Sequence, residues 1–158
     1  MSWRGAGDPQ DATPTSDLEA NKALARRFHE ELFNQGNMAA ADEIVAPDFV
    51  WHYPPNATYA NGPEGAKYEA AGTRRFYPGL VLTNDDVIAE GDRVVIRWTL
   101  HGTAQVEAGG IPVTVTGIDI FRIADGQLAE LWQLYDEQGL NRQLEAGPAP
   151  GAAGTPTA

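Results

Sequence analysis

The sequence GIDIFRIADGQLAELWQLYD, residues 117–136, decides the fold. Apolar and polar residues alternate on both sides of Ala124-Asp125-Gly126. Asp-Gly between two alternating runs is a strong β-hairpin signal, because glycine takes the positive φ that a tight turn needs. One acid, Asp119, interrupts the first run between two isoleucines. We expect this hairpin to form one wall of any site in the protein.

Side-chain alternation divides the hairpin into two faces. If Asp119 faces inward, it does so with Gly117, Phe121, Ile123, Leu131, Gln133 and Tyr135, while Ile118, Ile120, Trp132 and Leu134 face outward. An exposed apolar face on a curved sheet then predicts a homodimer through the outer sheet face. In the alternative arrangement, Asp119 faces water on the convex side and the isoleucines pack in the core.

Composition limits the class of protein. The 158 residues suit one domain, and 22 acidic against 11 basic residues give a net charge of -11, which argues against binding nucleic acid or an anionic membrane surface. The absence of cysteine excludes disulfides, thiolate metal sites and a thiol nucleophile. The first ten residues lack the apolar segment of a signal peptide, and no apolar run approaches the roughly 18 residues of a membrane helix. We therefore expect a cytoplasmic protein.

The chain reads as one domain with two loose ends. Residues 1–15 and 145–158 are rich in small residues and proline and are predicted to be a disordered lead and tail around a domain at 16–144. Apolar spacing predicts helices over 16–35, 38–46 and 62–77, and strands over 49–53, 80–89, 93–103, 111–123 and 127–135, with a kink at Asn84-Asp85-Asp86. Helices followed by strands indicate an α+β fold, with three N-terminal helices packed on a curved antiparallel sheet.

This order of elements, together with short matching segments, resembles the SnoaL-like polyketide cyclase and ester cyclase family of the NTF2-like superfamily. The segments are FNQGN (33–37), VAPDFV (45–50) leading to His52, GPEG (62–65), DVIAEGDRVV (86–95), RWT (97–99), Phe121-Arg122 before Asp125-Gly126, and Asp136 with Gly139 and Arg142-Gln143-Leu144. The resemblance covers nearly all of residues 16–144.

The resemblance implies a cone-shaped α+β barrel with a small-molecule pocket and no metal or organic cofactor. Characterised cyclases of the family close a polyketide ring by an intramolecular aldol step. They use an acid/base aspartate on the last strand and a polar helper on the strand before it. By register from Asp125-Gly126, the helper position falls on Asp119 and the acid/base position on Gln133. An amide cannot exchange a proton as a carboxylate does. Because of Gln133, the resemblance supports the family more strongly than it supports the family's reaction.

Three titratable residues are candidates for chemistry: Asp119, His52 and His101. Asp119 is the predicted proton-transfer group, because partial burial raises a carboxyl pKa towards the range of a general base. His52, at the expected rim of the cone, can act as an acid or base or can bond a loop carbonyl. His101 either pairs with Asp119 across the sheet or faces outward. His29 is expected to be a half-exposed helix residue.

The aromatic residues predict an apolar pocket that suits a small apolar or aromatic ligand. The predicted substrate-binding residues are Gln133, Tyr135, Phe121, Leu131, Trp51, Tyr53, Phe28 and Trp98, although aromatic residues are also the ordinary filling of a small core. The three histidines lack the spacing of a metal site.

Three functions remain open. The first is a cofactor-independent enzyme that acts on a small apolar or polyketide-like carbonyl compound by proton transfer, as a cyclase or isomerase does. The second is a non-catalytic small-molecule-binding or dimerisation module, which Gln133 favours. The third is a hydrolase similar to limonene-epoxide hydrolases, which need an Arg-x-Asp pair where this chain has Arg97-Trp98-Thr99.

Overall fold

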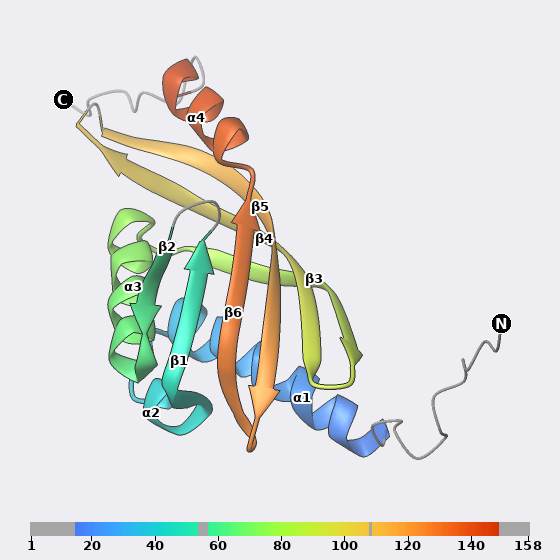
Figure 1. The fold of residues 1–158 in the computed structure, drawn as a ribbon. Coiled ribbons are helices and arrows are strands. Elements are labelled where there is room, and N and C mark those ends of the chain that lie inside the picture. The colour runs from blue at the N-terminus through green and yellow to red at the C-terminus, as the bar shows by residue number, and fades with distance from the viewer. Residues whose placement is uncertain (1–14, 54–56, 108, 149–158) are drawn as a thin grey trace, which may run out of the picture.

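One curved sheet organises the molecule. The computed structural model describes residues 15–53, 57–107 and 109–148. Six strands pair in the order β2-β1-β6-β5-β4-β3 (Figure 1). Their bounds are β1 Val45–Tyr53, β2 Ala57–Asn61, β3 Val81–Glu90, β4 Arg93–Val106, β5 Gly109–Ala124 and β6 Gln127–Tyr135. Within this part of the chain the edge strands β2 and β3 do not pair with each other, so the sheet is open rather than a closed barrel.

Two features of the sheet differ from the prediction. β1 pairs with β6 in the parallel direction, so the sheet is mixed rather than wholly antiparallel. We did not predict β2, because its sequence is rich in turn-forming residues. It pairs antiparallel with β1 at the edge of the sheet. The remaining neighbours pair antiparallel as expected.

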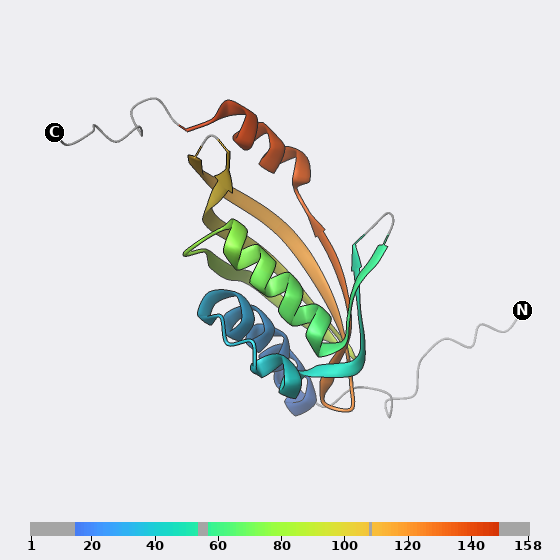
Figure 2. The same cartoon turned by 90° about the vertical axis from the view of Figure 1, so that its left-hand side faces the viewer.

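The helices pack mainly against one face of the sheet. α1 (Thr15–Arg27) continues without a break into a π-helix, η2 (Phe28–Gln35), and α2 (Ala40–Ile44) and α3 (Gly62–Phe76) follow. Figure 2 shows α1 and α3 on the inner side of the curved sheet. A helix that we did not predict, α4 (Glu137–Ala146), contacts β5 and extends past the expected domain end at 144. The expectation of three N-terminal helices therefore describes the helical content incompletely.

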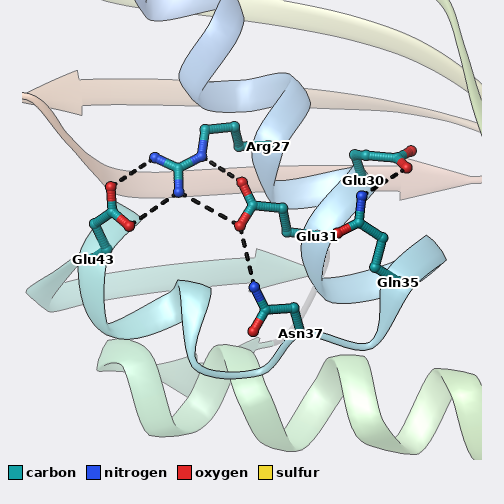
Figure 3. Close-up of polar contacts among 6 residues, drawn as sticks. All are labelled: Arg27, Glu30, Glu31, Gln35, Asn37 and Glu43. Atoms are coloured by element: carbon teal, nitrogen blue, oxygen red, sulfur yellow. Dashed lines mark hydrogen bonds and ion pairs between the residues drawn. The ribbon is translucent and has the colours of Figure 1, made fainter.

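Charged side chains hold the junction of α1 and η2. The Arg27 guanidinium binds both Glu43 oxygens, at 2.9 and 3.1 Å, and also binds Glu31, so it joins η2 to α2 (Figure 3). These acceptors raise the pKa of Arg27, and the same contact lowers the pKa of the Glu43 carboxyl. At the other end, Gly36 ends η2 at a φ of 71°, and the Arg74 side chain donates to the carbonyl oxygens of Phe33 and Asn34. η2 is thus fixed at both ends.

The hairpin has the predicted register. Asp119 lies opposite Gln133, and Asp125 and Gly126 take positive φ values of 51° and 73° in the turn. Burial alternates along β5, with odd-numbered residues buried from Ile111 to Ile123. The inward orientation of Asp119 is confirmed, since the residue is 1% exposed.

The core beneath the site is aromatic. The Phe28 ring lies 5.4 Å from that of Phe121 and 5.7 Å from that of Trp51, both in edge-to-face geometry. Such pairs add roughly 0.5–1.5 kcal/mol beyond the area they bury. No helix in the described ranges is long and apolar enough to cross a membrane.

Candidate active site

A cavity of about 430 Å³ lies between η2, α3 and the inner face of the sheet. Its walls are mainly apolar and aromatic, with a few polar groups. The lining residues are His29, Phe33, Trp51, Tyr53, Glu69, Thr73, Tyr77, Leu82, Trp98, Leu100, Val115, Gln133 and Tyr135. An apolar cavity of this size with a few converging polar groups is the usual form of a small-molecule site.

A buried histidine and aspartate form the polar centre of this cavity. His29 Nε2 lies 2.9 Å from Asp119 Oδ2, and the two side chains are 3% and 1% exposed. The other carboxyl oxygen, Oδ1, accepts a hydrogen bond of 2.9 Å from Trp98 Nε1. His29 Nδ1 lies 2.6 Å from Asn84 Oδ1. The imidazole lines the cavity, whereas Asp119 does not line it and fixes the ring through the hydrogen bond at Nε2.

The contacts of His29 use both of its ring nitrogens. Both ring nitrogens face oxygens, one from a carboxyl group and one assigned to an amide carbonyl. Oxygens of this kind accept hydrogen bonds, so both nitrogens are satisfied as donors when the ring is an imidazolium. The arrangement therefore suits a positive imidazolium beside a negative carboxylate at the floor of the cavity.

Local backbone irregularities bring these side chains together. His29 follows the first residue of the π-helix, whose wide turn buries Phe28, His29, Leu32 and Phe33 on one side. In β3 the register shifts between Asn84 and Asp86, which confirms the predicted kink. Asn84 lies opposite the buried Trp98, so this bulge directs its amide inward while Asp86 pairs with an exposed residue of β4.

Gly117 leaves the space that the Trp98 side chain occupies. Gly117 lies opposite Trp98 on β5, and a Cβ added at Gly117 would lie 2.3 Å from the indole ring. Only a residue without a side chain leaves room for that ring over the strand. The indole N–H consequently reaches Asp119, two residues further along β5.

Burial raises the pKa of three side chains on the cavity wall. The pKa of Tyr77 rises to about 12, with a smaller contribution from Tyr135. Burial also raises the pKa of Tyr53, whose ring stacks on Tyr135 with centroids 5.4 Å apart. Both hydroxyls therefore stay protonated at neutral pH. Burial raises the pKa of the Glu69 carboxyl as well.

Five of the predicted binding residues line the cavity: Trp51, Tyr53, Trp98, Gln133 and Tyr135. The other three, Phe28, Phe121 and Leu131, are buried in the aromatic and aliphatic core and do not line the cavity. Their inward direction was predicted correctly. However, residues below a cavity floor have the same apolar pattern as residues that line it.

The histidine predictions require correction. His101 is exposed and bonds Thr114 at 3.0 Å, so it does not pair with Asp119. His52 stacks on Trp132, bonds Glu130 at 2.9 Å and does not line the cavity. The partner of Asp119 is His29, which is 2% exposed and not the half-exposed helix residue that we expected. An ideal helix places residue 29 at the margin of the apolar stripe, and the π-helix moves it inside.

Arg97 also lies outside the cavity. It is exposed and bonds Asp86 at 2.6 Å and Asp85 at 3.2 Å. Of the Arg97-Trp98-Thr99 segment, which stands where limonene-epoxide hydrolases have an Arg-x-Asp pair, only Trp98 lines the cavity.

One face of α3 was missed by sequence reasoning. Glu69, Thr73 and Tyr77, spaced four residues apart, line the cavity. This spacing is the signal that could have identified them, since residues four apart share a helix face. It was obscured by the alanines at 66 and 70, which are buried and mark the packed face of α3.

No group of three or more His, Asp or Glu side chains is placed to hold a metal ion in the residues that the structure describes.

Comparison with known proteins shows which proteins the chain is similar to. No curated protein matches the chain. Solved structures do: TsrD from Streptomyces laurentii is 31% identical, with 81% of this chain and 96% of that chain covered and a TM-score of 0.70.

Two further structures share the fold. A proposed polyketide cyclase from Bacillus cereus ATCC 10987 is 26% identical, covers 87% of each chain and has a TM-score of 0.72. A proposed SnoaL-like polyketide cyclase from Jannaschia sp. CCS1 is 22% identical, covers 91% of this chain and all of that one, and has a TM-score of 0.73. The family model for SnoaL-like polyketide cyclase matches residues 23–144, and the chain therefore belongs to that family.

Proposed function

We propose that this protein is a cofactor-independent enzyme that transfers a proton on a small apolar or polyketide-like carbonyl compound, as a cyclase or isomerase does. The observation that carries the proposal is the buried His29–Asp119 pair at the floor of an aromatic-walled cavity. A carbonyl compound that loses an adjacent proton becomes an enolate, whose oxygen carries negative charge. A fixed positive group in an apolar cavity stabilises such a charge far more than water does.

Each polar group has a distinct part in this mechanism. Both N–H groups of His29 are already donated to Asn84 and Asp119, so its imidazolium would stabilise the developing oxygen charge through space. Asp119 is a positioning residue that acts through His29. The Gln133 amide and the hydroxyls of Tyr77 and Tyr135 offer neutral donors on the walls. Because its pKa is raised to about 12, Tyr77 remains a donor throughout the neutral range.

The cavity limits the substrate class. Its volume of about 430 Å³ and its tryptophan and tyrosine walls suit a bicyclic or tricyclic aromatic ketone. Family membership supports the same class, since polyketide intermediates carry carbonyl groups on such skeletons.

Deuterium exchange tests the proposal without knowledge of the natural substrate. 2-Tetralone, a bicyclic aromatic ketone, is incubated with the protein in D₂O, and deuterium beside its carbonyl is measured by mass spectrometry. We expect exchange above the buffer rate, and a decrease of at least about 100-fold in His29→Gln, because the variant loses the fixed positive charge that stabilises the enolate oxygen. Binding of 2-tetralone without any exchange above buffer would contradict the proposal.

A second candidate function is a non-catalytic binding module. Two observations favour it: Gln133 stands where the family places an acid/base aspartate, and both His29 nitrogens already have protein partners. In that case the ligand is bound and released unchanged. The exchange experiment distinguishes the two functions directly.

We also propose a homodimer through the outer sheet face. Ile118, Ile120 and Leu134 are 47%, 37% and 59% exposed, and with Trp132 they line an apolar groove on this face. Association would remove their surface from water at roughly 25 cal/mol per Å². A homodimer is the form in which one self-complementary patch covers itself.

A further inference from the structure

Glu69, on α3, lines the cavity together with Thr73 of the same helix and with Tyr77, which follows the last residue of α3. No described side chain bonds to it. By contrast Glu64, on the same helix, bonds Lys67 at 2.6 Å and is 84% exposed. Glu69 is therefore a half-buried acid that faces an apolar space without a partner of its own.

Such a position favours the neutral form of the acid. Burial raises the pKa of the Glu69 carboxyl. The other titratable side chains that line the cavity are His29, Tyr53, Tyr77 and Tyr135, with Asp119 behind His29. The two oxygens of Asp119 are occupied by Trp98 and His29, so among the carboxyl groups of the site only that of Glu69 is open to a ligand.

We propose that Glu69 is the base that takes the proton from the carbon beside the substrate carbonyl. It would supply the carboxylate that the family places at position 133, from a different element of the fold. This proposal rests on the proposed function and names the group that performs its central step.

The proposed step is balanced without a co-reactant. The C–H bond breaks, its proton moves to a Glu69 carboxylate oxygen, and its electron pair forms the enolate. The enolate carbon then attacks a second carbonyl of the same molecule, whose oxygen becomes an alkoxide and takes the proton from Glu69, or the enolate carbon itself regains that proton. The proton ends on the product in both cases, and Glu69 returns to its carboxylate form.

The two charged groups lie on separate elements. Glu69 comes from α3 and His29 from η2, and His29 already has Asp119 as its counter-ion. The carboxylate paired with the imidazolium is consequently that of Asp119 and not that of Glu69. This leaves Glu69 a base of raised pKa, which suits proton transfer near neutral pH.

The Kemp elimination of 5-nitrobenzisoxazole tests Glu69 independently of the natural substrate. A base in an apolar cavity removes the proton on the ring carbon, the N–O bond breaks, and a coloured cyanophenolate forms. The variants are Glu69→Gln, Glu69→Asp and, as the matched control on the same helix, Glu64→Gln. Circular dichroism checks that each variant is folded.

We expect Glu69→Gln to lower kcat/KM by at least about 100-fold, the usual size of a general-base contribution. Glu64→Gln should match the wild type, and Glu69→Asp should restore part of the rate. The kcat/KM of the wild type should rise with pH around a midpoint above the ordinary glutamate pKa, and this rise should vanish in Glu69→Gln.

Two results would overturn the inference. One is a Glu69→Gln variant within about threefold of the wild type, a change too small for a lost base. The other is a wild type no faster than buffer. In both cases exchange into 2-tetralone that depends on His29 would leave the proposed function standing with another base. Conversely, Glu69-dependent elimination without exchange into 2-tetralone would retain the base and refute the proposed function.

Discussion

Replacement of His29 by phenylalanine should strongly destabilise the protein. The change keeps a ring of similar size in the π-helix but removes the positive partner of Asp119. The carboxylate then remains buried with one hydrogen bond, from Trp98 Nε1. Since the two side chains are 3% and 1% exposed, water cannot replace the lost partner.

The magnitude follows from this burial. Removal of one partner of a buried ion pair costs about 3–5 kcal/mol. In a domain of this size each kcal/mol lowers Tm by about 2–4 °C, so the expected decrease is about 6–20 °C. The free energy of unfolding is measured by urea denaturation, with tryptophan fluorescence as the signal.

Two further variants separate charge from packing. His101→Phe, at an exposed histidine, should change the free energy of unfolding by less than about 0.5 kcal/mol. Adding Asp119→Asn to His29→Phe should recover at least about 1 kcal/mol, because asparagine can still accept from Trp98 and carries no charge. A loss of less than about 1 kcal/mol in His29→Phe would refute a buried ion pair at this site.

Three other predictions test separate parts of the account. Gly117→Ala should cost about 1–3 kcal/mol in urea denaturation, because its methyl group would overlap the Trp98 ring, and an unchanged stability would contradict that packing. Glu69→Gln should raise Tm relative to the wild type increasingly as the pH rises above the ordinary glutamate pKa, and should match it well below that pKa, because a raised carboxyl pKa destabilises the fold only where the acid must ionise. A Tm difference that is independent of pH would exclude this cause. Leu134→Glu should be a monomer by light scattering while Tyr68→Glu, changed at a 76% exposed residue of α3, stays dimeric; a Leu134→Glu dimer would rule out the proposed interface.

The hairpin could be predicted because its information is local. Alternation and Asp125-Gly126 set the register, and the register sets which side chains share a face. It therefore groups Asp119 with Gln133 and Tyr135. Alternation left two choices for the inward face, and the burial of Asp119 identifies the face that it shares with Gln133 and Tyr135. The bulge at Asn84 was also visible as a local break in the strand pattern.

The partner of Asp119 could not be predicted in the same way. His29 is 90 residues away in the chain, and only the π-helix turns it into the core. Periodicity at 3.6 residues per turn assumes an α-helix and so misplaces this side chain. The spacing of the strands made His101 the expected partner of Asp119. In the structure, His101 and Arg97 are both exposed on the outward-facing side of β4.

The remaining misses have similar causes. β2 has only five residues, and its pairing with β1 is a contact between segments that its own sequence does not reveal. α4 had local signals in the Asp136 cap, which accepts from Gly139 N at 2.8 Å, and in Leu140 and Leu144 at helical spacing. Glu69 could be recognised as a cavity residue only after the sheet opposite α3 was placed.

A crystal structure with 2-naphthol, a stable aromatic analogue of the 2-tetralone enol, would test the central claim most directly. We expect the naphthol ring to lie in the cavity between Trp51 and Trp98. Its oxygen should lie within about 3 Å of a donor among Tyr77, Gln133 and Tyr135, and the adjacent ring carbon should face Glu69. Naphthol bound on the outer sheet face, or with its oxygen directed away from all three donors, would contradict a cavity built to hold an enolate.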